Sequence, residues 1–305
     1  MTFGFINVLK PSGITSHDVV MRVRKWTKVK QVGHAGTLDP DATGVLPLAI
    51  GSACRLLRFL GSDKIYRAEI LLGTRTATDD LAGEVLEDKP IDEERIKQLL
   101  PETITSLLGK QEQMPPLYSA IHYQGKRLYE LARAGKVPDE IKARSVNIEA
   151  IDLISVNLPV VELRIKCSGG TYIRSIARDL GEKLGSGACL KSLVREKSGP
   201  FKLDQAVPLE TLKTLADAGQ LQEVIIPPEQ VLEINTIAIE QSQAKALIMG
   251  QSIFTTAFDR ADKNELTDER VCLTAYQGSL IALCRKKEDN KLHPEVVVGN
   301  VQSVA

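Results

Sequence analysis

Residues 33–51, GHAGTLDPDATGVLPLAIG, join a glycine-rich loop to an apolar run, and this stretch decides how the chain is built around one carboxylate. Its glycines tolerate positive φ angles and allow another backbone or a ligand to come close. Pro40 pushes the preceding Asp39 into an extended conformation and excludes it from a helix. The run Val45–Ile50 reads as core, so the stretch predicts a rigidly held aspartate at the edge of the core.

The composition is that of an ordinary globular protein. The chain has 305 residues, 43% hydrophobic and 26% charged, enough for two domains or one large domain with an appendage. No apolar stretch approaches the roughly 18 residues of a membrane span, and the N-terminus does not resemble a secretory signal. Five scattered cysteines without a C-x-x-C pair argue against disulfides and zinc. These features predict a cytoplasmic protein without a metal.

The charge is zero overall but uneven along the chain. A net charge of zero argues against a nucleic-acid partner, because such proteins are often basic. Residues 1–60, however, contain eight Lys and Arg against three Asp, and a similar excess runs through residues 121–200. Local potential matters more than the total for a polyanionic partner. Solvated lysines on an ordinary surface explain the same excess equally well.

The pattern of elements predicts an α+β protein. Alternating or apolar runs predict strands at 3–9, 65–72, 146–156 and 160–167. Helices are expected at about 14–26 behind a hydroxyl N-cap, and at 54–60, 92–100, 127–134, 171–184 and 241–249. Ile226-Pro227-Pro228 reads as a linker, and the runs VCLTAY, SLIALCRK and PEVVVGNV after it predict a small β module. The expected domains are therefore 1–230 and 231–305.

Asp39 has three interpretations when it is considered by itself. Most Asp-Pro pairs cap a turn through backbone N–H groups, and this structural role is favoured on spacing alone. A second carboxylate, Asp41, lies two residues on, so an acid/base pair of the glycosidase kind is also conceivable. The third possibility is a single carboxylate that acts on a substrate. Spacing does not decide between them.

Four other side chains could take part in chemistry, and each has an ordinary explanation beside the functional one. His34 could be a base, a stacking group or a simple loop histidine. Tyr66 starts a strand and would ordinarily be half buried. Arg174 follows a glycine turn at the start of a helix, where it could pair with a carboxylate or a phosphate, or face solvent. Leu193 would normally belong to the core.

Taken together, these residues resemble one family. The stretch at 33–51 closely resembles the catalytic motif of the TruB family of pseudouridine synthases. Other motifs of the family occur in its order: KPSGITSHDVV, KIYRAEILLGTRTATDDLAGEV, QMPPLYSA with GKRLYELAR, GTYIRSIARDLG and LKSLVREKSG. The resemblance covers about residues 3–201. It implies the pseudouridine synthase fold, a mixed and mainly antiparallel sheet flanked by helices, with an RNA-clamping insertion at about 110–145.

The resemblance also implies a role for each candidate residue. Asp39 matches the essential aspartate, which acts at C6 of the uridine base or at C1′ of its ribose. Arg174 matches the arginine that pairs with this aspartate and favours its charged form. Tyr66 matches the tyrosine that stacks on the target base and assists proton transfer at C5. Tyr172 and Leu193 match residues that line the same pocket.

A folded RNA must expose its uridine before the base can react, at a cost of a few kcal/mol. His34 matches the histidine that stacks in the vacated space. The implied substrate is uridine 55 in the T-loop of tRNA, with the T-stem also bound and the basic segments contacting phosphates. The resemblance implies no cofactor, no metal, no membrane, no guide RNA and no protein partner, and a monomer. The C-terminal module resembles, more weakly, a PUA-type RNA-binding domain.

Two other functions compete with an isomerase. An RNA-binding or tRNA-folding chaperone would use the same surface without chemistry, but would have no need of a charged aspartate in a base pocket. A hydrolase with a carboxylate pair would need both Asp39 and Asp41. The matching tyrosine, arginine and leucine motifs favour the isomerase.

Overall fold

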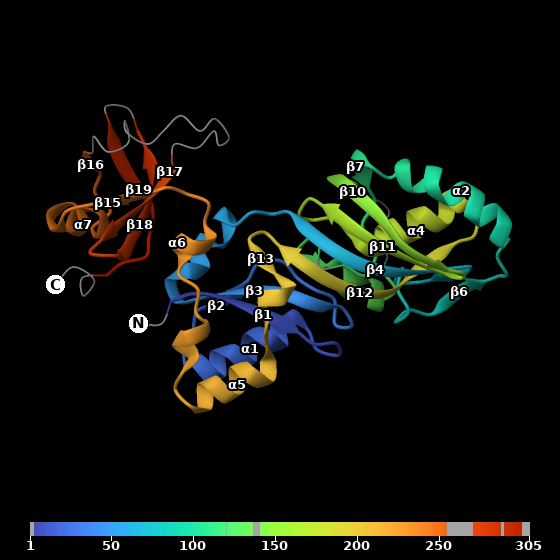
Figure 1. The fold of residues 1–305 in the computed structure, drawn as a ribbon, viewed down its shortest axis with the longest axis horizontal. Helices are drawn as coiled ribbons and strands as arrows, with labels where there is room; N and C mark the ends of the chain where they lie inside the picture. Colours follow the sequence, from blue (N-terminus) through green and yellow to red (C-terminus); the bar gives the residue numbers. More distant parts are fainter. Residues whose placement is uncertain (1–2, 120, 137–140, 255–270, 288–289, 301–305) are drawn as a thin grey trace.

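The computed structural model describes residues 3–119, 121–136, 141–254, 271–287 and 290–300. Parts of the insertion expected at 110–145 and of the C-terminal module expected at 231–305 lie outside these ranges. The described residues form a ten-stranded sheet with helices against it and a separate five-stranded sheet (Figure 1). The expected α+β class is confirmed.

The ten-stranded sheet runs in the order β14-β1-β3-β12-β4-β11-β10-β7, with β2 added to β3 and β13 to β12. Only the β1–β14 and β3–β12 pairings are parallel, so the sheet is mixed and mainly antiparallel, as expected. The β3–β12 pairing, at the middle of the sheet, joins just two residues of each strand. The strands are β1 Gly4–Lys10, β2 Val32–His34, β3 Thr43–Ile50, β4 Lys64–Leu72, β7 Gly109–Gln113, β10 Arg144–Asn157, β11 Val160–Cys167, β12 Ala188–Ser198, β13 Phe201–Lys202 and β14 Val207–Pro208.

Helices cover this sheet in two groups. In the first group, helix α4 packs on β12 and β4, and α2 packs against α4. In the second group, α1 packs against α5 and β2. The start of α1 confirms the expected hydroxyl cap, because Thr15 and Asp18 bond each other's backbone N–H reciprocally. The helices are α1 Ser16–Thr27, α2 Glu93–Thr105, α3 Leu128–Arg133, α4 Ile173–Leu184, α5 Leu209–Asp217 and α6 Pro228–Val231, with 3₁₀ turns η1 Gly51–Phe59, η2 Leu203–Gln205 and η3 Leu221–Val224.

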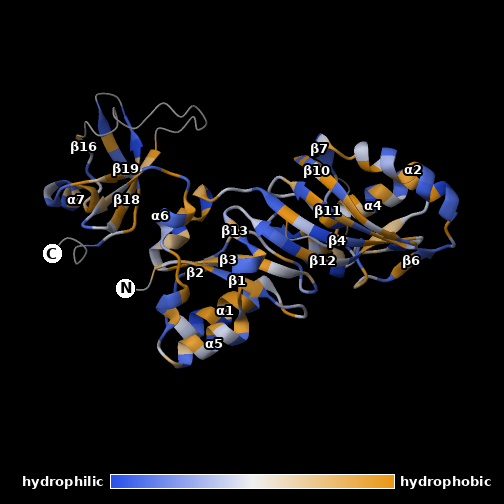
Figure 2. Cartoon of the chain, viewed as in Figure 1, coloured by the Kyte–Doolittle hydropathy of each residue, from blue (hydrophilic) through white to orange (hydrophobic). Residues whose placement is uncertain are grey.

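Two short hairpins complete this part of the molecule: β5 Thr74–Thr76 with β6 Val85–Asp88, and β8 His122–Tyr123 with β9 Lys126–Arg127. Polar and apolar residues alternate along the longer strands, as β10, β11 and β12 show in Figure 2. Strand β4 is buried at every second residue, from Lys64 to Leu72. Such alternation places one face of the sheet in the core and the other toward solvent.

The C-terminal sheet runs β15-β17-β18-β19-β16 and packs against α7. Its elements are β15 Thr236–Ala238, α7 Gln241–Ile248, β16 Ile253–Phe254, β17 Val271–Tyr276, β18 Ser279–Lys286 and β19 Lys291–Val297. Apolar side chains of both sheets share one core cluster, in which Phe5 and Val45 lie with Leu273 and Leu283. The C-terminal sheet therefore sits beside the β1–β3 end of the larger sheet, next to α6 (Figure 1).

Three elements differ from the sequence prediction. The expected helix at 54–60 is the 3₁₀ helix η1, which begins earlier, at Gly51. The expected helix at 92–100 continues through Pro101 to Thr105, because proline removes one helical hydrogen bond while Leu100 and Ile104 still bury their side chains. Residues 188–198 form the central strand β12, for which the sequence indicated only a leucine and arginine pattern. Buried polar side chains hide its strand character, since Arg195 and Ser198 both lie inside.

Candidate active site

The loop that carries Asp39 lies between β2 and β3, at the middle of the large sheet. It leads into β3 where Thr43 and Gly44 pair with Val194 and Arg195 of β12. Gly44 has a φ of +106°, and a Cβ at this position would overlap the backbone of Arg195. Glycine is therefore required here, as the close approach predicted from the sequence implies. The two strands fix the far end of the loop.

Lys10 holds the loop through hydrogen bonds to its backbone. It is fully buried at the end of β1, and its Nζ donates to the carbonyl oxygens of Pro11 at 2.9 Å, Pro40 at 2.8 Å and Ala42 at 2.7 Å. Burial lowers the pKa of Lys10 to about 8, against the opposing charges of Asp41 and Asp39. These three bonds use all the donors of an ammonium group. The backbone on both sides of the aspartate is thereby fixed.

Arg195 holds the same loop from β12. Its side chain is buried, and it donates to the carbonyl oxygens of Val45 at 2.7 Å, Gly36 at 3.0 Å and Thr37 at 3.4 Å. Ser16, in the first turn of α1, adds two bonds to the backbone of Leu38, at 2.9 and 3.0 Å. The loop is thus tied to three separate elements, which confirms the rigid aspartate loop expected from the sequence.

Arg174 pairs directly with Asp39. Its Nη2 donates to Oδ1 of Asp39 at 3.1 Å, and its Nε lies 3.0 Å from Oδ2. The arginine side chain is only 6% exposed, whereas that of Asp39 is 41% exposed. The guanidinium also donates to the carbonyl oxygens of Thr78 and Tyr118, both at 3.1 Å, and its Nε lies 3.6 Å from Asp80. A buried cation therefore holds a carboxylate whose other side is open.

The electrostatics of Asp39 combine opposing effects. Partial burial raises the pKa of Asp39 above its usual value of 3.8, the Arg174 charge lowers it, and Asp80 raises it again. Lys10 and Arg195 surround the loop with further positive charge. Buried cations therefore surround the carboxylate of Asp39 and favour its charged form against the effect of burial.

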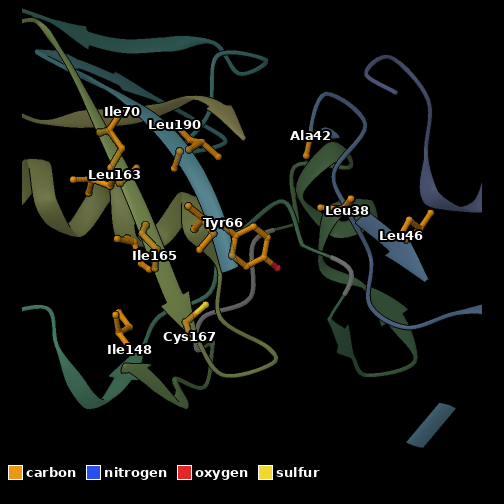
Figure 3. Close-up of a cluster of buried hydrophobic side chains, with 14 of the residues drawn as sticks. Leu38, Ala42, Leu46, Tyr66, Ile70, Ile148, Leu163, Ile165, Cys167 and Leu190 are labelled. Carbon is orange, nitrogen blue, oxygen red and sulfur yellow. The ribbon is translucent and has the colours of Figure 1, made fainter. Parts of the chain in front are cut away.

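Tyr66 and Leu193 lie on neighbouring strands next to this loop. Tyr66 of β4 is buried and its backbone pairs with Arg195, while Leu193 pairs with Ala68 on the same two strands. Figure 3 shows the Tyr66 ring at the edge of the apolar cluster, with its hydroxyl directed toward the segment that carries Leu38 and Ala42. Burial raises the pKa of Tyr66, so the phenol is protonated at neutral pH. Leu193 is partly buried against the same cluster.

His34 and Tyr172 come from two other elements, the end of β2 and the residue before α4. His34 ends β2 opposite Leu48, and its Nδ1 is buried without a hydrogen-bond partner among the described residues. Burial lowers the pKa of His34 below 6.5, with the charges of Arg195 and His17 adding to the effect, so the ring is neutral at pH 7. Tyr172 precedes α4, where its backbone N–H and C=O both bond the side chain of Gln113, at 2.8 and 3.1 Å.

The second carboxylate of the loop does not share this environment. Asp41 is exposed, and Arg174, which contacts Asp39 and Asp80, makes no contact with it within the described ranges. In the same ranges no group of three or more His, Cys, Asp or Glu side chains is arranged to hold a metal ion. Also within them, no helix combines the length and apolar character needed to cross a membrane.

The sequence did not single out Lys10 or Arg195 as members of the site. Lys10 is a lone cation at the end of the apolar run FINVLK, and this placement is the available signal for it. Arg195 lies among other charged residues in SLVREK, so its burial has no such signal. A buried cation must find several acceptors, and apart from Pro11 the acceptors here are loop carbonyls 30 or more residues away along the chain. The identity of those acceptors depends on the tertiary fold.

An Arg195→Met variant tests the role of this buried guanidinium in holding the loop. Methionine fills much of the space but leaves three carbonyl oxygens without their donor, so we expect the free energy of unfolding to fall by about 3 kcal/mol. Urea denaturation followed by circular dichroism measures the change. Arg55→Met, at an exposed position of η1, is the control and should shift stability by less than about 0.5 kcal/mol. Equal midpoints for the two variants would contradict the role.

Comparison with known proteins agrees with this geometry. Residues 24–173 match the model of the TruB family pseudouridylate synthase N-terminal domain, and residues 174–233 match that of the tRNA pseudouridylate synthase B C-terminal domain. A protein of Synechocystis named tRNA pseudouridine synthase B is 46% identical over 82% of this chain and 85% of that protein. One of the same name from Dehalococcoides mccartyi is 40% identical over 96% of both chains.

Solved structures share the fold. A Cbf5-Nop10-Gar1 complex contains a chain with a TM-score of 0.70 and 25% identity, covering 99% of this chain and 87% of that one. An H/ACA RNP bound to a substrate RNA containing 2′-deoxyuridine contains another, with a TM-score of 0.69, 23% identity and the same coverage. The family models and the named relatives define the chain as a pseudouridine synthase, an isomerase. The chain belongs to the TruB family of these enzymes.

Proposed function

We propose that this protein isomerises uridine 55 in the T-loop of tRNA to pseudouridine, with Asp39 as the catalytic residue. The observation that carries the proposal is the carboxylate of Asp39, held by buried Arg174 at 3.0 and 3.1 Å on one side and open on the other. Relatives named tRNA pseudouridine synthase B, at 40% and 46% identity, support tRNA as the substrate.

The reaction conserves all atoms of the uridine. The bond from N1 to C1′ breaks, C5 joins C1′ in its place, the proton on C5 leaves, and N1 gains a proton. No electrons are exchanged with a second molecule, so the chemistry asks for a nucleophile and for proton transfer. An ionised Asp39 supplies the nucleophile, at C6 of the base or at C1′ of the ribose, and Arg174 keeps it ionised and oriented.

The other candidate residues surround the reacting base in this proposal. Tyr66 stacks on it, and the Tyr66 hydroxyl, directed toward the Asp39 loop in Figure 3, assists proton transfer at C5. Leu193, which is partly buried in the adjoining strand, and Tyr172, at the start of α4, line the pocket. His34 fills the space that the extruded uridine leaves. Its neutral ring suits stacking between bases.

Two further regions are proposed to bind the RNA. The insertion at about 110–145 clamps the substrate, and its described part is tied to α4 through Gln113 and through the contact of Tyr118 with Arg174. The C-terminal module at 231–305 acts as a PUA-like RNA-binding domain after a catalytic domain at 1–230. In support, Phe254 is 65% exposed on β16, with the ammonium of Lys291 lying 5.0 Å from its ring centre. Exposed aromatic rings are common stacking partners of RNA bases.

We also propose that the enzyme acts in the cytoplasm as a monomer, without guide RNA or a protein partner. The insertion and the C-terminal sheet give one chain several RNA-contacting surfaces of its own. A chaperone without chemistry is not favoured, because it would not require the paired Asp39 and Arg174. A carboxylate-pair hydrolase is not favoured either. Asp41 is exposed, and the carboxylates that Arg174 contacts are those of Asp39 and Asp80.

The test is to incubate the purified protein with unmodified tRNA transcript and to map pseudouridine chemically along it. We expect a single new pseudouridine, at position 55 of the T-loop, without any added cofactor or guide RNA. A tRNA with cytidine in place of that uridine is the control and should show no product. The absence of product at position 55 with the intact transcript would overturn the proposal.

A His34→Ala variant tests the proposed stacking role. Stacking between a base and an aromatic side chain contributes about 1–3 kcal/mol, so we expect the single-turnover rate to fall roughly tenfold. The dissociation constant for tRNA should change less, because the histidine fills its space only after the base is extruded. His34→Phe keeps an aromatic ring and should restore most of the rate. If rate and affinity fall equally, the histidine has another role.

A further inference from the structure

A basic hollow lies at the C-terminal end of α1, apart from the Asp39 loop. Its volume is about 580 Å³, and it is lined by Met21, Arg24, Lys25, Lys28, Val29 and Lys30. The lining thus contains four cations and no carboxylate. We keep the name basic hollow for this set of six residues.

The cations of the basic hollow have no acidic partners among the residues that the structure describes. Within the described part of the chain none of the four forms an ion pair. Arg24 donates from Nη2 to the carbonyl of Val32 at 2.9 Å, which fixes its guanidinium, while its Nε is buried with no hydrogen-bond partner there. Three exposed lysines and a fixed arginine around one hollow, none of them paired with a carboxylate among the described residues, indicate a place for an anion.

The helix dipole explains only part of this cluster. Cations in the last turn of a helix are favourable, and Arg24 and Lys25 occupy that turn of α1. Lys28 is the C-cap residue, and only Lys30 lies beyond the helix end, where the effect of the dipole falls off. Lys28 adopts a left-handed conformation with φ of 56°, which ends the helix, and Val29 and Lys30 after it still line the hollow. The cluster therefore exceeds what the helix end requires.

One residue that lines the basic hollow, Lys30, is close to His34 in the sequence. Lys30 precedes His34 by four residues, which can span at most about 14 Å. In the proposed function His34 fills the space that the extruded uridine leaves, so the phosphates on either side of that uridine would lie near His34 and within reach of the hollow. An RNA strand offers such regularly spaced monovalent anions, and Met21 and Val29 offer apolar surface for its riboses.

We propose that the basic hollow binds the phosphodiester backbone of the substrate RNA, close to the extruded uridine. This inference rests on the proposed function, because it takes the RNA to lie at His34, which fills the space of the extruded uridine. Lys25 and Lys30 act as phosphate contacts, and the fixed guanidinium of Arg24 adds positive charge to the lining of the hollow. Such contacts orient RNA without reading its sequence.

The test measures tRNA binding by Lys25→Gln combined with Lys30→Gln, at several salt concentrations. We expect the dissociation constant to rise about tenfold at 0.1 M salt, and the slope of log K against log salt to fall by about 2. Lys89→Gln with Lys97→Gln is the matched control, since it removes the same two charges from exposed residues that are already paired with glutamates. The control should keep the wild-type slope.

A double variant whose affinity and slope match those of the control would overturn the proposal. An acidic surface of another protein would then be the alternative ligand of the basic hollow. Pseudouridine formation by the double variant should recover as the tRNA concentration is raised, because the loss lies in binding. The two failures are distinguishable. A wild-type protein that binds tRNA but forms no pseudouridine contradicts the proposed function, whereas an unchanged salt slope contradicts only the basic hollow.

Discussion

Asp39→Asn is expected to abolish pseudouridine formation while tRNA still binds. The amide keeps the size of the side chain but has no nucleophilic oxygen anion, so the single-turnover rate should fall by about 10⁴-fold or more. The affinity for tRNA should change by less than about fivefold, because one partly exposed charge is worth at most about 1 kcal/mol. Chemical mapping of the product and filter binding of labelled tRNA measure the two quantities.

Asp41→Asn is the matched control for this prediction, since it removes the same charge from the same loop. Asp41 is exposed, and nothing in the proposed reaction uses it. We expect its rate to stay within about threefold of the wild type, as for most exposed substitutions away from special contacts. An inactive Asp41 variant would favour the carboxylate-pair hydrolase. An active Asp39 variant would refute the proposed mechanism directly.

The fold was predictable from the sequence wherever local pattern and burial agree. Strands β1, β4 and β11 alternate or stay apolar along their length, and α1 begins at its hydroxyl cap, so each was predicted nearly to its ends. Strand β12 was not, because its pairing with β3 and β4 buries Arg195 and Ser198. A polar residue inside a sheet depends on partners far away in the chain, and no local pattern reveals them.

The candidate site shows the same division. The pairing of Asp39 with Arg174 was implied by the family resemblance and is confirmed by the structure. The residues that hold the loop were missed, because Lys10 and Arg195 bond backbone carbonyls of the loop. Every residue type has such a carbonyl, so the sequence does not show which ones accept these bonds. The catalytic role of Asp39 and the roles of Tyr66, Arg174, His34, Tyr172 and Leu193 toward the substrate stay predictions. The positions of His34, Tyr172 and Leu193 beside β3, α4 and β12 are compatible with a pocket, and the variants proposed above decide the matter for His34.

An Arg174→Met variant should lose activity in a way that depends on pH. Removing the guanidinium takes away the charge that lowers the pKa of Asp39, so this already raised pKa rises further. At any given pH below the new pKa, a smaller fraction of the carboxylate is ionised. The acid limb of kcat/KM therefore moves to higher pH, and raising the pH restores part of the rate. At pH 7.5 we expect a loss of about 10²- to 10³-fold, because an oriented donor is also missing.

Arg178→Met separates this effect from a general loosening of α4. Arg178 lies one turn further along the same helix and contacts Asp79, Asp179 and the carbonyl of Met114, but not Asp39. Its acid limb should coincide with that of the wild type, whatever its effect on stability. Arg174→Lys should fall between, since one ammonium replaces the charge but cannot reach Asp39, Thr78 and Tyr118 together. If Arg174→Met lowers the rate equally at every pH, the arginine only positions the loop, and the ionisation of Asp39 does not depend on it.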